Sequence, residues 1–152
     1  MRLQELVKAL PEAKVAGLRE VEITNLAYDS RKVKEQGLFV AVCGHRQDGH
    51  GYIQAAVKNG AVAVVLERDD DLLPEAVVRI RVPNSREALS RISACFYGFP
   101  ASRLSMVGIT GTGGKTTTSY LLEAIWQASG ARVGVIGTVN CRFAGCVRPS
   151  PV

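Results

Sequence analysis

The chain of 152 residues contains no apolar stretch that approaches membrane-spanning length. A transmembrane helix needs about 20 mostly apolar residues, and charged residues interrupt every apolar run of this sequence well before that. Residues 1–10 mix Arg2, Glu5 and Lys8 into a short amphipathic pattern. This pattern differs from the basic and then apolar order of a secretory signal peptide. We therefore expect no membrane partner.

Clustered charge and metal-ligand spacings are also missing. The net charge is +5, but the basic residues are scattered and form no run, so we expect no nucleic-acid partner. The four cysteines include no Cys-x-x-Cys pair, and both histidines are far in sequence from Cys141 and Cys146. Free thiols in apolar runs, such as Cys43 and Cys95, commonly pack as small hydrophobic groups. Reduced, buried cysteines are typical of a cytosolic protein, and we expect that location.

The first hundred residues alternate between strand and helix patterns, which favours an α/β fold with a largely parallel sheet. Helices are predicted over residues 3–10, 53–60 and 85–97, and strands over 21–28, 38–42, 61–66 and 77–82. The run at 61–66 is apolar throughout, as expected of a strand that is covered on both faces. Asn84 is expected to cap the helix that follows it, with Glu87 as its reciprocal partner.

A second α/β unit is predicted after a short linker at 99–103. A strand pattern at 104–109 leads into a Gly-rich turn at 110–115, a helix at 116–129 and another strand at 132–137. The apolar side chains expected to form the packing face of this helix are Leu121, Leu122, Ile125 and Ala128. The predicted fold class is α/β, with an N-terminal domain over 1–100 and the first βαβ unit of a P-loop nucleotide-binding domain over 101–152.

The Gly-rich turn is the strongest functional signal in the chain. Glycines let backbone N–H groups converge on phosphate oxygens, and the following helix directs its positive end to the same place. Lys115 is the predicted catalytic residue, reaching the β- and γ-phosphates of ATP or GTP, and the Thr116 hydroxyl is the predicted Mg²⁺ ligand. The turn departs from the general P-loop pattern because Ile109 stands where its first glycine is expected. The expected nucleotide-binding residues are Gly111, Thr112, Gly113, Gly114, Lys115, Thr116 and Thr117.

Further motifs accompany this turn in a fixed order: Tyr28-Asp-Ser-Arg31 followed by Gly37-Leu-Phe-Val-Ala41, Gly44-His-Arg-Gln-Asp-Gly-His50, and Val135-Ile-Gly-Thr138 ahead of Pro149-Ser-Pro. With residues 110–116, this set resembles the Mur ligases, the ATP-dependent amide-bond-forming enzymes of peptidoglycan synthesis. The family's P-loop reads Thr-Gly-Thr-Asn-Gly-Lys-Thr/Ser, so Gly113 replaces the usual asparagine here. The motifs are most similar to the branch of the family that adds the third residue of the peptide.

The resemblance implies that residues 1–100 bind the UDP part of UDP-N-acetylmuramoyl-L-alanyl-D-glutamate. The matching positions are Tyr28, Ser30, Arg31, His45, Arg46 and Gln47. The Ser30 hydroxyl and the Arg31 guanidinium suit phosphate or uracil oxygens, and the Tyr28 ring suits a base. Taken alone, residues 29–31 are more often a solvated turn, and His45 and His50 are more often surface or turn histidines. Only the order and spacing of the motifs favour binding.

The resemblance also implies a reaction for the complete enzyme. ATP phosphorylates the D-glutamate carboxylate of the substrate, and the amine of meso-diaminopimelate or L-lysine then attacks the acyl phosphate. P-loop enzymes usually hold Mg²⁺ with a later carboxylate as well, but Glu123 is the only acidic residue after Lys115 and belongs to the helix itself. We therefore expect the front part of a longer ligase, without ligase activity of its own.

Two alternatives remain open at this point. The first is a non-catalytic fragment that only binds a UDP-sugar. The second is another P-loop ATPase or a small-molecule kinase. A kinase would need an acidic metal ligand within these residues, and the sequence places none well.

Overall fold

The structure is a computed structural model that describes residues 1–17, 19–44, 47–68 and 73–150. They fall into two compact units, Met1–Leu104 and Ser105–Val152. Every helix in the described residues is too short or too polar to traverse a bilayer.

The first unit is built on a five-stranded sheet with strand order β1-β5-β4-β3-β2. Its strands are β1 Lys14–Ala16, β2 Asn25–Ala27, β3 Gly37–Val40, β4 Ala61–Leu66 and β5 Val78–Arg81. Strands β2, β3, β4 and β5 pair in parallel, and β1 runs antiparallel to β5 at the edge. The predicted parallel sheet is confirmed, and the predicted 21–28 strand is shorter than expected. Because four strands share one direction, their carboxyl ends meet at a single edge.

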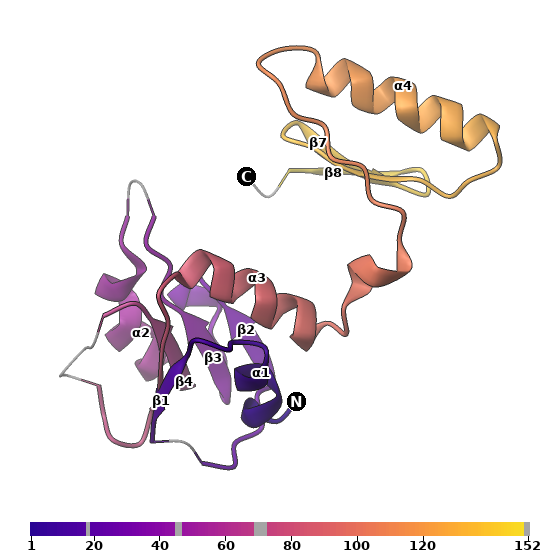
Figure 1. The fold of residues 1–152 in the computed structure, drawn as a ribbon. Helices are drawn as coiled ribbons and strands as arrows, with labels where there is room; N and C mark the ends of the chain where they lie inside the picture. The colour runs from indigo at the N-terminus through magenta and orange to yellow at the C-terminus, as the bar shows by residue number, and fades with distance from the viewer. Residues whose placement is uncertain (18, 45–46, 69–72, 151–152) are drawn as a thin grey trace. The chain divides into compact units, whose positions relative to one another are not determined.

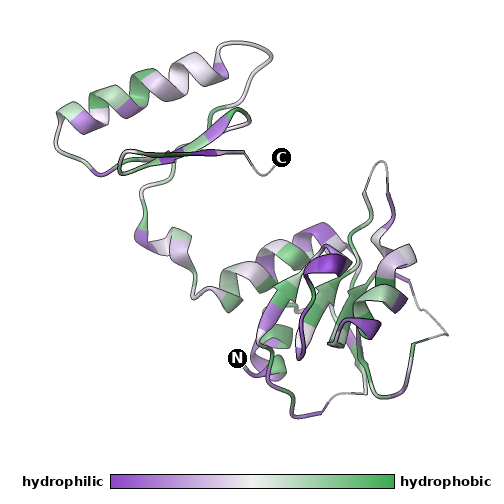
Figure 2. Ribbon diagram, turned by 180° about the vertical axis from the view of Figure 1, so that it is seen from behind, coloured by the Kyte–Doolittle hydropathy of each residue, from purple (hydrophilic) through white to green (hydrophobic). Residues whose placement is uncertain are grey.

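Helices cover both faces of this sheet (Figure 1). The unit contains α1 Leu3–Lys8, α2 Ile53–Lys58 and α3 Ser85–Phe96, with short 3-10 turns η1 Ser30–Lys32, η2 Gly49–Tyr52 and η3 Pro100–Arg103. One cluster of buried side chains joins α1 and α3 to the sheet, and a second cluster joins α2 to the opposite face. Apolar segments gather along the strands in the hydropathy view (Figure 2).

The side chains of β3 show how the sheet supplies both clusters. Leu38 and Val40 belong to the α1–α3 side, whereas Phe39 and the following Ala41 belong to the α2 side. All four side chains are fully buried. Successive strand residues point to opposite faces, so a run that is apolar at every position fits a strand covered on both sides. This is the reason why the sequence lacks alternation here.

Helix α3 begins as the sequence predicts. The Asn84 side-chain oxygen accepts hydrogen bonds from the backbone N–H groups of Arg86 and Glu87 at 3.0 and 3.1 Å. The reciprocal cap is wrong, because the Glu87 carboxylate instead accepts from the Arg91 guanidinium at 2.8 and 3.0 Å. A charge-assisted contact one turn later is stronger than a bond to a neutral N–H group.

The second unit contains one helix and a small antiparallel sheet of order β6-β7-β8. The elements are α4 Lys115–Ala128, β6 Gly134–Ile136, β7 Asn140–Phe143 and β8 Cys146–Pro149. The predicted strand at 132–137 is present in shortened form. The predicted strand at 104–109, and with it the βαβ unit, is wrong, since the described residues offer that segment no partner strand. A strand at 104–109 would need hydrogen bonds from a neighbouring strand. In this unit β6, β7 and β8 pair only with one another, as an antiparallel sheet.

The hairpin between β7 and β8 was missed by the sequence patterns. Its two-residue turn, Ala144-Gly145, has positive φ values of 49° and 78°, as a type I′ turn requires. Asparagine, aspartate or glycine usually occupies the first of these positions. Because alanine stands there, the turn signal is weak in the sequence.

Arg142 joins the helix of the second unit to its sheet. This buried side chain of β7 donates to the Glu123 carboxylate at 2.7 Å and to the Asn140 side chain at 2.7 Å, and it stacks on the Tyr120 ring. No apolar residue of α4 is fully buried within the described part of the chain. The predicted packing face of α4 is therefore wrong for this unit, because a three-stranded sheet covers little of the helix.

Substitution of one buried and one exposed aliphatic residue tests this difference between the units. Ile92→Ala should lower the free energy of unfolding by about 2–5 kcal/mol, since it leaves a cavity in the core of α3 and the sheet. Leu121→Ala on exposed α4 should change it by less than about 0.5 kcal/mol. Urea denaturation of both variants, followed by circular dichroism, provides the measurement. Equal losses would contradict the described burial.

Candidate functional site

The carboxyl ends of the four parallel strands bring together loops that are far apart in sequence. Residues 28–31 follow β2, residues 41–50 follow β3, Glu67 and Arg68 follow β4, and Ser85 lies just beyond β5. Ligands of open α/β sheets bind at this edge, because the loops there can vary while the strands hold them in place. The predicted substrate residues that the structure describes all belong to these loops.

The turn after β2 exposes an aromatic ring and a guanidinium group. Tyr28 is 60% exposed, and Ser30 is buried at the start of η1. Asp29 accepts hydrogen bonds from the backbone N–H and the side chain of Arg31 at 2.8–3.0 Å. These bonds lower the pKa of Asp29 to about 2, and those from the Arg31 side chain have the larger effect. Arg31 is thus oriented by its neighbour while its remaining donors face solvent.

The turn after β3 is shaped by two glycines at points of close approach. The Gly44 N–H group donates to the Gln47 carbonyl, and the Gly49 N–H group donates to the Val42 carbonyl, both at 2.9 Å. A Cβ atom on Gly44 would lie 2.5 Å from the Gln47 oxygen, and one on Gly49 would lie 2.6 Å from the Val42 nitrogen. Larger residues are excluded at both positions. Gln47 is exposed, while the predicted residues His45 and Arg46 lie outside the described residues.

His50 is held by hydrogen bonds at both ring nitrogens. Its Nδ1 lies 2.7 Å from the Asp48 carboxylate, and its Nε2 accepts from the Glu67 N–H group at 3.0 Å. A backbone N–H group can only donate, so Nε2 is unprotonated and Nδ1 carries the proton. The side chain is 7% exposed. The expectation of a surface or turn histidine is met only in part: His50 lies in the 3-10 turn η2, but that turn places its ring, largely buried, against the end of β4.

Asp48 is the centre of this arrangement. Its carboxylate also accepts from the His50 backbone N–H group at 3.0 Å and pairs with the Arg68 guanidinium. The two hydrogen bonds from His50 lower the pKa of Asp48 to about 2. The carboxylate therefore stays ionised at neutral pH and ties η2 to the end of β4.

A second set of bonds joins β3, β4 and α3. Glu67 accepts from the Ser85 hydroxyl at 2.7 Å and from the Ser85 N–H group at 2.8 Å, and these bonds lower the pKa of Glu67. The Ser85 hydroxyl oxygen accepts from the Cys43 N–H group at 3.2 Å, and Arg86 donates to the Cys43 carbonyl at 3.2 Å. Both backbone polar groups of Cys43 are thus anchored to the beginning of α3.

Cys43, Asp48 and His50 place potential metal-ligand atoms within 4.8 Å of one another. Metal binding requires a deprotonated thiol and a free imidazole nitrogen. Burial raises the pKa of the Cys43 thiol, while both nitrogens of His50 are engaged within the protein. We therefore interpret the cluster as a hydrogen-bonded network. The expectation of buried thiols is not met, because Cys146 is exposed and Cys43, Cys95 and Cys141 are half-buried.

The Gly-rich turn has the backbone that a phosphate cradle requires. Gly111 and Gly114 have φ values of 148° and 75°, which favour glycine. Helix α4 begins at Lys115 without a side-chain cap on its first N–H groups. The Lys115 ammonium donates to the Gly111 carbonyl across the turn, and Thr116 and Thr117 are exposed in the first helical turn. Unbonded N–H groups, a helix N-terminus and an ammonium therefore converge on one place.

Neither the backbone conformation nor a close contact requires glycine at position 113. Its φ lies outside the left-handed region, and a Cβ atom there would meet nothing within 4 Å. An asparagine, which the Mur ligase P-loop usually has at this position, would fit the same turn. Glycine at this position therefore leaves the turn without that side chain.

Glu123 is already engaged as the ionic partner of Arg142. Both side chains are largely buried, at 13% and 10% exposed. An ion pair in such surroundings is costly to break. The carboxylate is therefore no second Mg²⁺ ligand, as the sequence indicates, and the kinase alternative gains no support from it.

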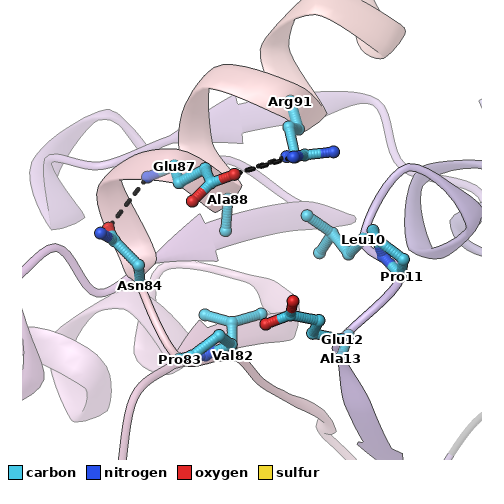
Figure 3. Close-up of a pocket in the computed structure, with 10 residues that line it drawn as sticks. All are labelled: Leu10, Pro11, Glu12, Ala13, Val82, Pro83, Asn84, Glu87, Ala88 and Arg91. Atoms are coloured by element: carbon cyan, nitrogen blue, oxygen red, sulfur yellow. Dashed lines mark hydrogen bonds and ion pairs between the residues drawn. The ribbon is translucent and has the colours of Figure 1, made fainter.

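A shallow cleft elsewhere in the first unit is lined by residues of the α1–β1 connection and the beginning of α3 (Figure 3). Its most polar wall is the Glu87–Arg91 ion pair, and Leu10, Val82 and Ala88 supply apolar surface. None of the predicted substrate or nucleotide residues lines it. Because Val82, Pro83 and Asn84 directly follow β5, the cleft borders the β5 end of the carboxyl edge, where none of the predicted site residues lies.

Comparison with known proteins covers both units. The family model "Mur ligase family, catalytic domain" matches residues 22–97, and the model "Mur ligase middle domain" matches residues 109–145. These two ranges include the loops at the sheet edge and the Gly-rich turn. The first range alone spans half of the chain.

Two curated relatives are named UDP-N-acetylmuramoyl-L-alanyl-D-glutamate–2,6-diaminopimelate ligase. The protein from Geobacter metallireducens is 44% identical over 99% of this chain, and the one from Geobacter sulfurreducens is 46% identical over 99%. The chain spans only 29% and 30% of their respective lengths.

Solved structures show the same fold. A structure of a UDP-N-acetylmuramoyl-L-alanyl-D-glutamate–2,6-diaminopimelate ligase aligns with a TM-score of 0.61 and 26% identity, covering 84% of this chain and 26% of that one. The MurF ligase of Thermotoga maritima, solved in complex with ADP, aligns with a TM-score of 0.50 and 32% identity, covering 68% and 23%.

The ionised state of Asp48 predicts a specific acid sensitivity. Its pKa falls from 3.8 to about 2 on folding, so the unfolded chain binds more protons between these values. The free energy of unfolding should then decrease as the pH falls from about 4 to about 2. Asp48→Asn should lose stability at pH 7 and should show a flatter pH dependence in this window. Urea denaturation at several pH values measures how the free energy of unfolding depends on pH in wild type and in Asp48→Asn. An identical dependence in the two proteins would contradict the role of Asp48.

Proposed function

The chain belongs to the Mur ligase family, and from this premise we propose that it is the N-terminal part of an ATP-dependent ligase that adds diaminopimelate to UDP-N-acetylmuramoyl-L-alanyl-D-glutamate. The observation that carries the proposal is the identity of 44–46% with two enzymes of that name over 99% of the chain. Because the chain spans about 30% of their length, the activity, the substrates and the cytoplasmic location are part of the proposal. L-Lysine stays the alternative amino acid, since the described residues contain no recognised amine site.

The first unit is proposed to hold the UDP-sugar at the carboxyl edge of its sheet. Tyr28 offers an exposed ring beside which a base can lie. Arg31 keeps free donors for phosphate or uracil oxygens. Gln47 lies exposed at the end of the turn after β3. Ser30 is buried, so its role is the least direct of the four. His45 and Arg46 complete the set from the sequence alone.

The second unit is proposed to bind the phosphates of ATP. The fit rests on the positive φ values of Gly111 and Gly114 and on the free N–H groups at the start of α4. ATP supplies the phosphoryl group that activates the substrate carboxylate. Lys115 would neutralise phosphate charge, and the Thr116 hydroxyl would hold Mg²⁺. Among the described residues, no carboxylate beyond the P-loop is free to assist Thr116.

Titration with UDP-N-acetylmuramoyl-L-alanyl-D-glutamate tests the first part of the proposal. Backbone amide shifts in NMR spectra should concentrate at residues 28–31 and at Gln47. Arg31→Ala should weaken binding by about 1.5–3 kcal/mol, the value of a charge-assisted hydrogen bond. Arg91→Ala, an exposed arginine of α3, serves as the matched control and should bind normally. Shifts confined to other regions would show that the site is misplaced.

Calorimetry with Mg²⁺-ATP tests the second part. Lys115→Ala should lower the affinity by about 1.5–3 kcal/mol, because it removes the ammonium that lies over the turn. Lys58→Ala, at the exposed end of α2, removes the same charge outside the turn and should have no effect. Equal ATP affinities for wild type and Lys115→Ala would refute the assignment of the phosphate site.

A further inference from the structure

A single imidazole links two of the loops at the carboxyl edge of the sheet. His50 follows β3 in sequence, and its ring reaches the backbone of Glu67 at the end of β4. Its other nitrogen donates to Asp48, two residues earlier in the chain. The ring therefore connects the turn that carries Gln47 to a strand that is 17 residues away in sequence.

The ring itself is not available to a ligand. Both nitrogens have partners within the protein, and the side chain is 7% exposed. Any influence of His50 on binding must therefore act through the groups that it holds. The first of these is Asp48, the neighbour of Gln47 in the chain.

The other end of the same turn is held by the beginning of α3. The Gly44 N–H group donates to the Gln47 carbonyl, and the preceding Cys43 is bonded through its N–H and carbonyl groups to Ser85 and Arg86 of α3. One end is thus tied to α3 and the other, through Asp48 and His50, to β4. Both anchors converge on Glu67, whose N–H group binds His50 and whose carboxylate binds Ser85.

We propose that His50 is a positioning residue: its neutral, Nδ1-protonated ring clamps the turn that ends at Gln47 and so sets the affinity of the first unit for the nucleotide part of its substrate. The inference rests on the proposed function. A loop that is already held in its binding conformation loses less freedom when a ligand binds. The titratable groups around the ring are Asp48, Glu67 and the Cys43 thiol, and Arg68 pairs with the far side of the Asp48 carboxylate.

NMR spectroscopy of the ¹⁵N-histidine-labelled chain tests the state of the ring. Long-range proton–nitrogen spectra should show His50 as the Nδ1–H tautomer, the less common form for a free imidazole, and the Glu67 amide should exchange slowly with solvent. The second histidine of the chain, His45, supplies an internal comparison. A proton on Nε2 of His50 would overturn the proposal.

Two conservative variants separate the two bonds of the ring. His50→Asn retains a donor near Asp48 but loses the acceptor for the Glu67 N–H group, whereas His50→Gln can extend an acceptor to that group. We expect UDP-N-acetylmuramoyl-L-alanyl-D-glutamate to bind His50→Asn about tenfold more weakly than wild type, with partial recovery in His50→Gln. Ile92→Val, at a buried position of α3, is the control for a general loss of stability and should bind as wild type does.

The possible outcomes separate the inference from the function on which it rests. Wild-type binding together with unchanged affinity in both His50 variants would refute the clamp alone. A loss of affinity in Ile92→Val equal to that in His50→Asn would refute it too, since general destabilisation would then explain both. Absence of binding by the wild type would refute the proposed function, and with it the clamp. Zn²⁺ that displaced the Nδ1 proton of wild type would show that the cluster binds metal instead.

Discussion

Parallel pairing of β2, β3, β4 and β5 is the constraint on which the first unit depends. Parallel strands all end at the same edge of the sheet. Residues 28–31, 41–44, 47–50, 67–68 and 85 therefore lie at the same edge, although no local pattern in the sequence connects them. The core supports this arrangement because helices cover both faces, so the inner strands β3 and β4 carry no polar side chain.

The edge of this sheet combines exposed binding groups with a buried polar support. Tyr28, Arg31 and Gln47 face solvent, whereas His50 lies beneath the surface. Backbone and side-chain donors keep Asp48 and Glu67 ionised by lowering their pKa values. A buried polar group without partners would destabilise the fold, and these groups satisfy one another across three elements.

The second unit is organised by local geometry more than by a core. Its turn is set by the φ values of Gly111 and Gly114, and its helix is held by Arg142 through Glu123 and Tyr120. Helix α4 fully buries no apolar residue within the described unit, and several apolar side chains of β6–β8 are exposed. The phosphate turn keeps its shape under these conditions because glycine conformations and helix initiation involve neighbouring residues only.

The sequence by itself determined the features that depend on neighbouring residues. The Asn84 cap, the apolar strands at 38–42 and 61–66, and the glycines of the phosphate turn follow from local conformational preferences and periodicity. The tertiary structure decided what depends on distant groups. The pairing state of residues 104–109 depends on partner strands, and Glu123 is committed to an arginine 19 residues away. His50 looks like an ordinary turn histidine in the sequence, since the Glu67 N–H group that defines its tautomer is supplied only when β3 and β4 pair side by side.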